Sequence, residues 1–391
     1  MLLLRNKSIA LLFTGQALYW GCNMIGITLT SLVGLQLAPL NILATLPLAL
    51  LVLGNLLTVQ PLSLFMQRHG RRPGLMLGAS CGIVGGLLGA LGVWLGDFGL
   101  FCLAALPLGA YQASAMYYRF AALEAVDSTQ QGRASAYVIG GGVAAALIAP
   151  SLVLWSQNAL GTPFVGAYLM MALLALGGVL LMAQLREGAA PVPSKGGLAA
   201  LRELLGRPQI RAAVATTAVG HGLMIMIMTS TPLAMQFCGL SLANSSQVIQ
   251  WHMLGMFLPA FVAGQLVDKL GSVKVAVLGS LILLISASIA LSGLAQAHFL
   301  ISSFLLGLGW NLMLIAGTTL LASGHSAAER GNAQGLMELS NGSVAAGASF
   351  ASGALISSFG WGAVNIGTLP LVAIALLMLL PVRNKAVARH S

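Results

Sequence analysis

Apolar stretches of 20 or more residues recur along this chain, and they constrain its fold more than any other feature. As a helix, each stretch is long enough to cross the roughly 30 Å hydrocarbon core of a bilayer. Hydrophobic residues make up 58% of the chain and charged residues only 7%, so a water-soluble domain of this size would expose large apolar surfaces. The alternating segments of about 10 residues that are typical of membrane β-strands do not occur. We therefore predict an all-α membrane protein.

Twelve such stretches predict twelve transmembrane helices. A polar connection at 185–209, which contains Pro191 and Pro193, separates six spans from the next six and is typical of a linker. The predicted organisation is an N-terminal six-helix bundle at 1–184, a cytoplasmic linker at 185–209 and a C-terminal six-helix bundle at 210–391. The predicted spans are 9–33, 40–65, 73–95, 98–120, 132–156, 163–184, 210–236, 244–268, 272–295, 298–322, 331–357 and 361–381.

The basic residues predict the orientation of the chain in the membrane. If both termini are cytoplasmic, all 18 Lys and Arg residues fall on the cytoplasmic side, as the positive-inside rule requires. The net charge of +10 then reflects topology and attraction to anionic lipid headgroups, and nucleic-acid binding is not expected. The basic residues are Arg5, Lys7, Arg68, Arg71, Arg72, Arg119, Arg133, Arg186, Lys195, Arg202, Arg207, Arg211, Lys269, Lys274, Arg330, Arg383, Lys385 and Arg389.

The two halves of the chain carry similar loops after their second predicted helix. The first loop contains Arg68, Gly70, Arg71 and Arg72, and the second contains Gly264, Asp268, Lys269 and Gly271. Duplicated halves of this kind are typical of transporters that rock two similar bundles around a central site.

The Gly-x-x-x-Asp-Arg/Lys-x-Gly pattern of these loops resembles the signature of the major facilitator superfamily, and the layout of six plus six helices extends the resemblance over the whole chain. The second copy matches the pattern, whereas the first has Ser63 and Gln67 in place of Gly and Asp. The resemblance implies that the loops help to close the cytoplasmic side. The departures imply a weaker closing contact in the first half, and the alternative is that the basic residues only anchor topology.

Two pairs of soft donor residues occupy consecutive spans in the second half. Met228 and Met224 lie 12 and 16 positions before Leu240, and His252 and Met256 lie 12 and 16 positions after it. Antiparallel helices joined near Leu240 would hold the two pairs at matching depths, with each pair on one helical face. The sequence therefore predicts a metal site within the membrane.

The residue types in these pairs favour copper over other metals. Thioether sulfur and neutral imidazole suit Cu(I), whereas Mg, Ca and Mn prefer oxygen ligands. His221 and Met235 lie on the same stripe of their helix, and Cys238 lies at its outer end, so these three are weaker candidates. The alternative is that the methionines fill helix interfaces, as methionine often does. A buried imidazole favours function, because it is costly in a membrane without a partner.

Within the superfamily, Met-x-x-x-Met followed by His-x-x-x-Met resembles the CcoA-type copper importers. The matching residues are Met224, Met228, His252 and Met256. This resemblance implies import of copper, as the ion or a small complex, across a bacterial inner membrane for the assembly of cbb3-type cytochrome c oxidase. It also implies downstream copper chaperones as partners, with copper as the substrate and no permanently bound cofactor. Related carriers include riboflavin-type transporters.

Other polar residues leave two alternatives open. Glu338, a carboxylate about two turns into a predicted span, would carry a coupling proton in a carrier of an organic solute, such as a drug exporter or vitamin importer. The alternative is that it snorkels toward the cytoplasmic headgroups or pairs with a neighbour. Asn23, Asn311 and Asn341 either line a cavity or bond across helices. The second alternative is a receptor or assembly factor that transports nothing. No catalytic grouping or phosphate-binding loop occurs in the sequence, so no enzyme activity is expected.

Overall fold

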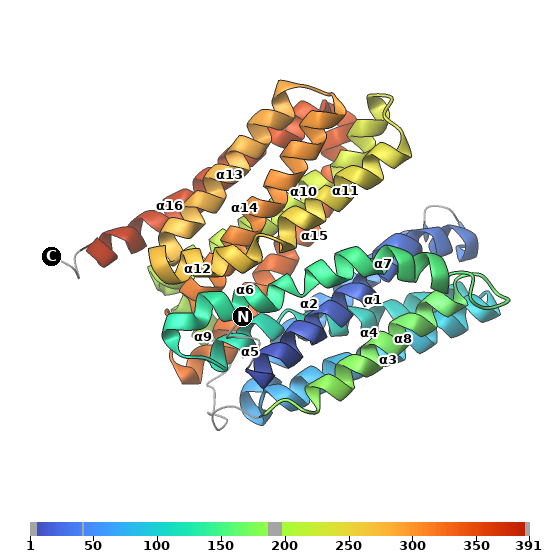
Figure 1. The fold of residues 1–391 in the computed structure, drawn as a ribbon, viewed down its shortest axis with the longest axis horizontal. Helices are drawn as coiled ribbons and strands as arrows, with labels where there is room; N and C mark the ends of the chain where they lie inside the picture. The colour runs from blue at the N-terminus through green and yellow to red at the C-terminus, as the bar shows by residue number, and fades with distance from the viewer. Residues whose placement is uncertain (1–5, 41–42, 187–197, 388–391) are drawn as a thin grey trace. The chain divides into compact units, whose positions relative to one another are not determined.

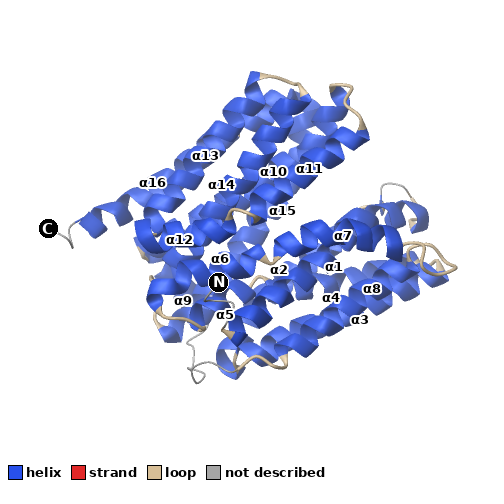
Figure 2. Ribbon diagram, viewed as in Figure 1, coloured by secondary structure: helices blue, strands red, loops and turns tan. Residues whose placement is uncertain are grey.

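The computed structural model describes residues 6–40, 43–186 and 198–387. Of the residues used to predict topology, Arg5, Lys195 and Arg389 lie outside the described part, as do residues 187–197 of the predicted linker. The described residues form helices joined by turns and contain no strand (Figure 2). Helices satisfy their own backbone hydrogen bonds, which apolar surroundings require. The predicted all-α membrane fold is confirmed.

The helices follow the predicted spans closely. Among the described residues, eleven stretches are long and apolar enough to cross a membrane, and the last of these, Ala327–Val382, covers both predicted spans 331–357 and 361–381. The two are merged because α15 continues through a bend at Gly360, where φ is 76°. The helices are α1 (Lys7–Leu37), α2 (Leu46–His69), α3 (Arg71–Leu95), α4 (Phe98–Ala115), α5 (Tyr118–Glu124), α6 (Gln131–Gly140), α7 (Gly142–Ser156), α8 (Val165–Met182), α9 (Leu198–Gly206), α10 (Pro208–Phe237), α11 (Leu242–Phe257), α12 (Ala260–Leu270), α13 (Ser272–Ser292), α14 (Gln296–Ala322), α15 (Arg330–Ile366) and α16 (Thr368–Val387), with short 3-10 turns η3 (Ser128–Gln130) and η4 (Ala327–Glu329).

Local sequence explains where several helices begin. The Asp97 side chain accepts a hydrogen bond from the backbone N–H of Leu100 at 2.9 Å and so caps α4. Gly96 just before it adopts φ 68° and ends α3. Ser241 caps α11 in the same way by accepting from the N–H of Asn244. Such caps satisfy backbone groups that the first and last turns leave free. The turn predicted at Leu240 therefore lies between two well-defined helix ends.

The chain divides into two compact units, each traced by its helix labels in Figure 1. The first contains residues 1–125 and 141–194, and the second contains residues 126–140 and 195–391. The division differs from the predicted boundary in one place, because it passes through the predicted span 132–156. Helix α6 packs against α12 and α14 of the second unit, whereas α7 packs against α1 of the first. The chain changes unit at the run Gly140–Gly142.

Glycine allows the helices of the first unit to approach closely. Helix α4 packs on α2 and α3, and α8 packs on α1 and α3. A Cβ atom added at Gly54 of α2 would lie 2.3 Å from the backbone oxygen of Leu106. One added at Gly86 of α3 would lie 2.6 Å from the backbone nitrogen of Ala172. Small residues at such crossings let the helix backbones touch. In lipid no hydrophobic effect drives helices together, so they associate through this close van der Waals packing.

The second unit is built around α10 and α14. Helix α10 packs against α14, α15 and α16, and α14 also packs against α11 and α13. One apolar cluster of buried side chains runs through this unit and includes Leu223, Met226, Met235, Phe299 and Met313. The predicted soft-donor residues of α10 thus lie on a helix that supplies much of the apolar core of its own unit.

Candidate functional site

The four predicted metal ligands lie on α10 and α11 as expected. Met224, His252 and Met256 are buried, with exposed fractions of 7%, 3% and 5%. Met228 is half-buried and packs against the apolar cluster of the second unit. Both helices contact α14, and α10 also contacts α11. The structure therefore gives Met228 an apolar packing role, while the other three side chains remain buried candidates.

His252 has one ring nitrogen in use and one without a partner. Its Nδ1 lies 2.8 Å from the backbone oxygen of Ser303 on α14. A carbonyl oxygen only accepts, so Nδ1 carries the proton and Nε2 presents a lone pair when the ring is neutral. Nε2 is buried, and within the described residues it has no hydrogen-bond partner. A buried lone pair of this kind is suited to a metal ion or to a hydrogen-bond donor on a ligand.

Asn311 of α14 has a similar arrangement near Met256. Its Nδ2 donates to the backbone oxygen of Met256 at 2.7 Å, and the side chain is fully buried. Its Oδ1 is also buried and has no partner within the described residues. Asn311 was predicted either to line a cavity or to bond across helices, and the structure shows the hydrogen bond across helices. The sequence signal was an amide in the middle of an apolar span.

The three weaker candidates lie in different surroundings. His221 accepts a hydrogen bond at Nδ1 from the indole Nε1–H of Trp310, with 3.1 Å between the nitrogens. Met235 is fully buried inside the apolar cluster. Cys238 is exposed at the end of α10. The described part of the chain contains no group of three or more His, Cys, Asp or Glu side chains placed to hold a metal ion, so a metal site here would depend on methionine sulfur.

Glu338, the predicted coupling residue, is buried in α15 with an exposed fraction of 4%. A buried carboxylate within a membrane-spanning helix needs a partner or a functional reason to be there. The coupling role of Glu338 remains a prediction.

The two similar loops share one backbone geometry. Gly70 ends α2 with φ 95° and ψ 165°, and Gly271 ends α12 with φ 84° and ψ 153°. This conformation is accessible almost only to glycine. The basic residues around the two glycines are placed similarly. Arg68 in the last turn of α2, Arg72 at the start of α3 and Lys269 near the end of α12 are exposed, and Arg71 is half-buried.

The charged side chains of these loops have different partners. In the second unit, the Asp268 carboxylate accepts hydrogen bonds from the backbone N–H of Gly132 at 2.9 Å and from Nε of Arg133 at 2.8 Å, at the start of α6. In the first unit, Arg71 donates to both carboxylate oxygens of Glu124. Asp268 therefore caps a helix as well as forming an ion pair. A negative charge is stabilising at a helix N-terminus, because the helix dipole is positive there.

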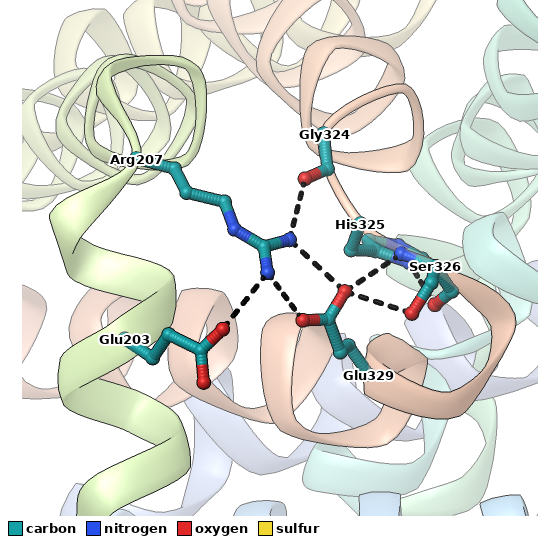
Figure 3. Close-up of polar contacts among 6 residues, drawn as sticks. All are labelled: Glu203, Arg207, Gly324, His325, Ser326 and Glu329. Carbon is teal, nitrogen blue, oxygen red and sulfur yellow. Dashed lines mark hydrogen bonds and ion pairs between the residues drawn. The ribbon is translucent and has the colours of Figure 1, made fainter.

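A second ionic cluster, not predicted from sequence, joins the start of α10 to the turn before α15 (Figure 3). Arg207 donates to Glu329 and Glu203, and also to the backbone oxygen of Gly324. Glu329 also accepts hydrogen bonds from the backbone N–H and the hydroxyl of Ser326, at 2.9 and 2.8 Å. The motif Ser326-Ala-Ala-Glu329 is a capping box, which is a signal readable from sequence.

The fold and these loops define a membrane transport protein, and comparison with known proteins gives the family. The Major Facilitator Superfamily profile matches residues 11–286 and 239–391. The chain belongs to this superfamily.

Two relatives and two solved structures illustrate the similarity. The chain is 36% identical over 382 residues to the riboflavin transporter RfnT of Brucella anthropi, covering 96% of this chain and 95% of that protein. It is 31% identical over 354 residues to the MFS-type transporter YdeG of Bacillus subtilis, covering 85% and 80%. The outward conformation of the transporter FucP has a TM-score of 0.77 at 16% identity, covering 95% and 97%. An outward-facing bacterial homologue of the iron transporter ferroportin has a TM-score of 0.77 at 14% identity, covering 96% and 98%. At these identities the structures show the fold alone.

Proposed function

We propose that this protein is a secondary transporter that carries a riboflavin-type organic solute across the bacterial inner membrane by alternating access. The observation that carries this proposal is the 36% identity to a riboflavin transporter over nearly the full length of both chains. It favours the organic solute, which the sequence left as the alternative, over copper. The proposal makes the protein a carrier and gives it no catalytic step.

The one-sided distribution of 18 basic residues supports an orientation with both termini in the cytoplasm. Cysteine labelling from each side of the membrane in whole cells tests this orientation. The exposed Cys238 is a natural reporter, because it lies at the end of α10 that the proposed topology assigns to the outer face.

Copper import is the second candidate, and a specific observation supports it. The Nε2 lone pair of His252 is buried without a partner in the described residues, and Met256 and Met224 are buried on the same two helices. Imidazole and thioether groups suit Cu(I). In this function copper, as the ion or a small complex, would be the substrate and would pass to chaperones of oxidase assembly. The apolar packing of Met228 makes a four-ligand site less favourable.

Uptake into vesicles that contain only this protein separates the two candidates. The proposal expects saturable uptake of riboflavin, and Met224→Leu combined with Met228→Leu should leave that uptake near the wild-type value. Leucine keeps the bulk and apolarity of methionine, so packing should change by less than about 1.5 kcal/mol. Met226→Leu is the matched control, because Met226 belongs to the same run and lies in the apolar cluster.

Copper uptake in the same vesicles tests the second candidate. Wild-type Cu(I) uptake that falls sharply in the double variant and not in Met226→Leu, with no riboflavin uptake, would reverse our order of preference. Full copper flux in the double variant would show that Met224 and Met228 are not needed to bind the transported copper. Either result also excludes a receptor that transports nothing, because flux requires only this chain.

The proposed driving force is a proton gradient acting through Glu338. Glu338→Gln should abolish the dependence of uptake on the pH gradient while preserving equilibrium binding of the solute, because glutamine keeps the shape of the side chain and cannot release a proton. Wild-type uptake that ignores the pH gradient would contradict this role.

A further inference from the structure

Helices α11 and α14 pack closely beside two buried polar atoms that have no partner within the described residues, Nε2 of His252 and Oδ1 of Asn311. A Cβ atom added at Gly255 of α11 would lie 2.3 Å from the backbone oxygen of Phe304. One added at Gly307 of α14 would lie 2.6 Å from the backbone oxygen of His252. The two backbones are therefore in contact, and His252 and Asn311 lie about one turn to either side of this contact.

Both side chains donate a hydrogen bond to a backbone carbonyl oxygen of the facing helix. His252 Nδ1 bonds the oxygen of Ser303, and Asn311 Nδ2 bonds the oxygen of Met256. Because a carbonyl oxygen only accepts, these contacts fix the tautomer of the histidine and the orientation of the amide. The remaining polar atoms, Nε2 and Oδ1, are then both acceptors.

Two buried acceptors without donors are unfavourable in the empty protein, since buried polar groups nearly always find a partner. Both atoms lack one within the described residues. Neither α11 nor α14 carries a Lys, Arg, Asp or Glu side chain. The site is thus complementary to a neutral ligand that presents hydrogen-bond donors, such as hydroxyl or ring N–H groups.

The span that carries His252 is also interrupted beside the contact between α11 and α14. Helix α11 ends at Phe257 and α12 begins at Ala260, and Pro259 between them has no N–H to continue the helical bonds. Discontinuous helices are typical places for substrate sites in transporters, because backbone groups at the break can contact the substrate. The break at Leu258 and Pro259 lies within about two turns of His252.

We propose that Nε2 of His252 and Oδ1 of Asn311 are substrate-recognising acceptors, and that the transported solute donates hydrogen bonds to them through hydroxyl or ring N–H groups. This inference rests on the proposed function and assigns its specificity to two residues. Riboflavin offers both kinds of donor, in its ring imide and its hydroxylated side chain. Asn311 is not part of the predicted copper site, so its contribution separates this inference from metal binding.

Quenching of riboflavin fluorescence by the purified full chain tests the inference. His252→Leu and Asn311→Leu should each weaken binding about tenfold, since each removes one acceptor. His252→Gln should stay within about threefold of wild type, because glutamine can still donate to Ser303 and still offers an oxygen, while it is a poor ligand for Cu(I). The matched control is Asn365→Leu, because Asn365 is equally buried and also donates to a backbone carbonyl, that of Trp361 in its own helix.

Ligand analogues keep the test decisive even if a leucine variant fails to fold. Methylation of the ring N–H, or removal of the hydroxylated chain, should weaken binding to the wild type. At least one of these penalties should shrink in the variant that lacks the matching acceptor, as coupling in a double-mutant cycle requires. Monodisperse elution of each variant in detergent checks its fold.

The outcomes are distinguishable. Riboflavin binding within twofold of wild type in both leucine variants overturns the inference and leaves the proposed function standing. Loss of binding in His252→Gln equal to that in His252→Leu, together with Cu(I) binding by the wild type, also overturns it, because it would assign His252 to a metal. A folded wild-type protein that binds no riboflavin overturns the proposed function itself.

Discussion

At Gly70 in the first unit and at Gly271 in the second, the backbone leaves one helix and enters the next with nearly the same dihedral angles. The charges around these two turns are arranged differently. In the second unit Asp268 holds the N-terminus of α6, whereas in the first unit Arg71 holds Glu124 at the end of α5. Glycine thus gives both turns nearly the same backbone, whereas their ionic partners differ.

The same difference explains a departure in the sequence pattern. The second loop has Gly264 where the first has Ser63. A Cβ atom at Gly264 would lie 2.6 Å from both the Cα of Arg133 and the backbone oxygen of Gly132. Glycine is required at this position of α12 because α6 packs directly against it.

The largest effect is expected from Gly264→Ser, which places the residue of the first loop in the second. The added atoms meet backbone that cannot rotate away, so overpacking should destabilise the second unit by about 3 kcal/mol. Thermal unfolding in detergent measures the change. Gly347→Ser is the control, because a Cβ at Gly347 meets no atom within 4 Å, and an equal loss in both variants would contradict the steric explanation.

Asp268→Asn should have the next largest effect, at about 2 kcal/mol, because a neutral amide weakens bonds that a carboxylate accepts from the start of α6. We also expect slower transport with normal membrane insertion, since this loop is the copy that keeps the family pattern. Transport rate and cysteine accessibility from both sides measure the effect. Unchanged values of both would show that Asp268 does not act as a latch.

Gly70→Ala and Gly271→Ala should each cost about 1–2 kcal/mol, because both positions lie in a backbone region that other residues rarely adopt. The comparison predicts equal costs, as the dihedral angles are nearly equal. Gly347→Ala should be neutral or slightly stabilising, since it lies in a helix with open space around it. Urea or thermal unfolding of the three variants checks this order, and a cost at only one of the two turns would break the equivalence.

The smallest effect, about 1 kcal/mol or less, is expected from Glu124→Gln in the first unit. Glutamine keeps one acceptor for Arg71, and the guanidinium also contacts the sulfur of Met66 and lies over the ring of Tyr117. Thermal unfolding beside Asp268→Asn provides the measurement. A larger loss for Glu124→Gln than for Asp268→Asn would reverse our ranking of the two loops.

The sequence was sufficient for features that depend on local pattern. Apolar length predicted the spans, and the family pattern predicted the turns at Gly70 and Gly271. An imidazole is conspicuous in an apolar span, so the sequence also singled out His252, whose functional role stays a prediction. The partners of these residues could not be predicted, since the Ser303 carbonyl that fixes His252 and the Gly132 N–H that Asp268 holds are distant in sequence and are backbone groups.

Helical periodicity predicted which residues share one face of a helix, but not which neighbouring side chains pack against that face. It placed Met228 and Met235 on the stripe of Met224, and the structure packs both against or within the apolar cluster. Methionine suits both roles, so its residue type does not separate a ligand from a core side chain. In the Arg207 cluster, the capping box of Ser326 and Glu329 could be predicted from the sequence. The ion pair between Glu329 and Arg207 could not, because the two residues are distant in sequence.

The division of the predicted fifth span between the two units has a consequence for the order of biosynthesis. Gly132 of α6 and the Asp268 side chain that caps it are 136 positions apart, and α7 to α11 are synthesised between them. Domains commonly fold in order from the N-terminus during translation. Here the segment 126–140 must wait for α12 before its own helix start is satisfied, so this early-made part of the second unit completes its packing only after Asp268 has been synthesised.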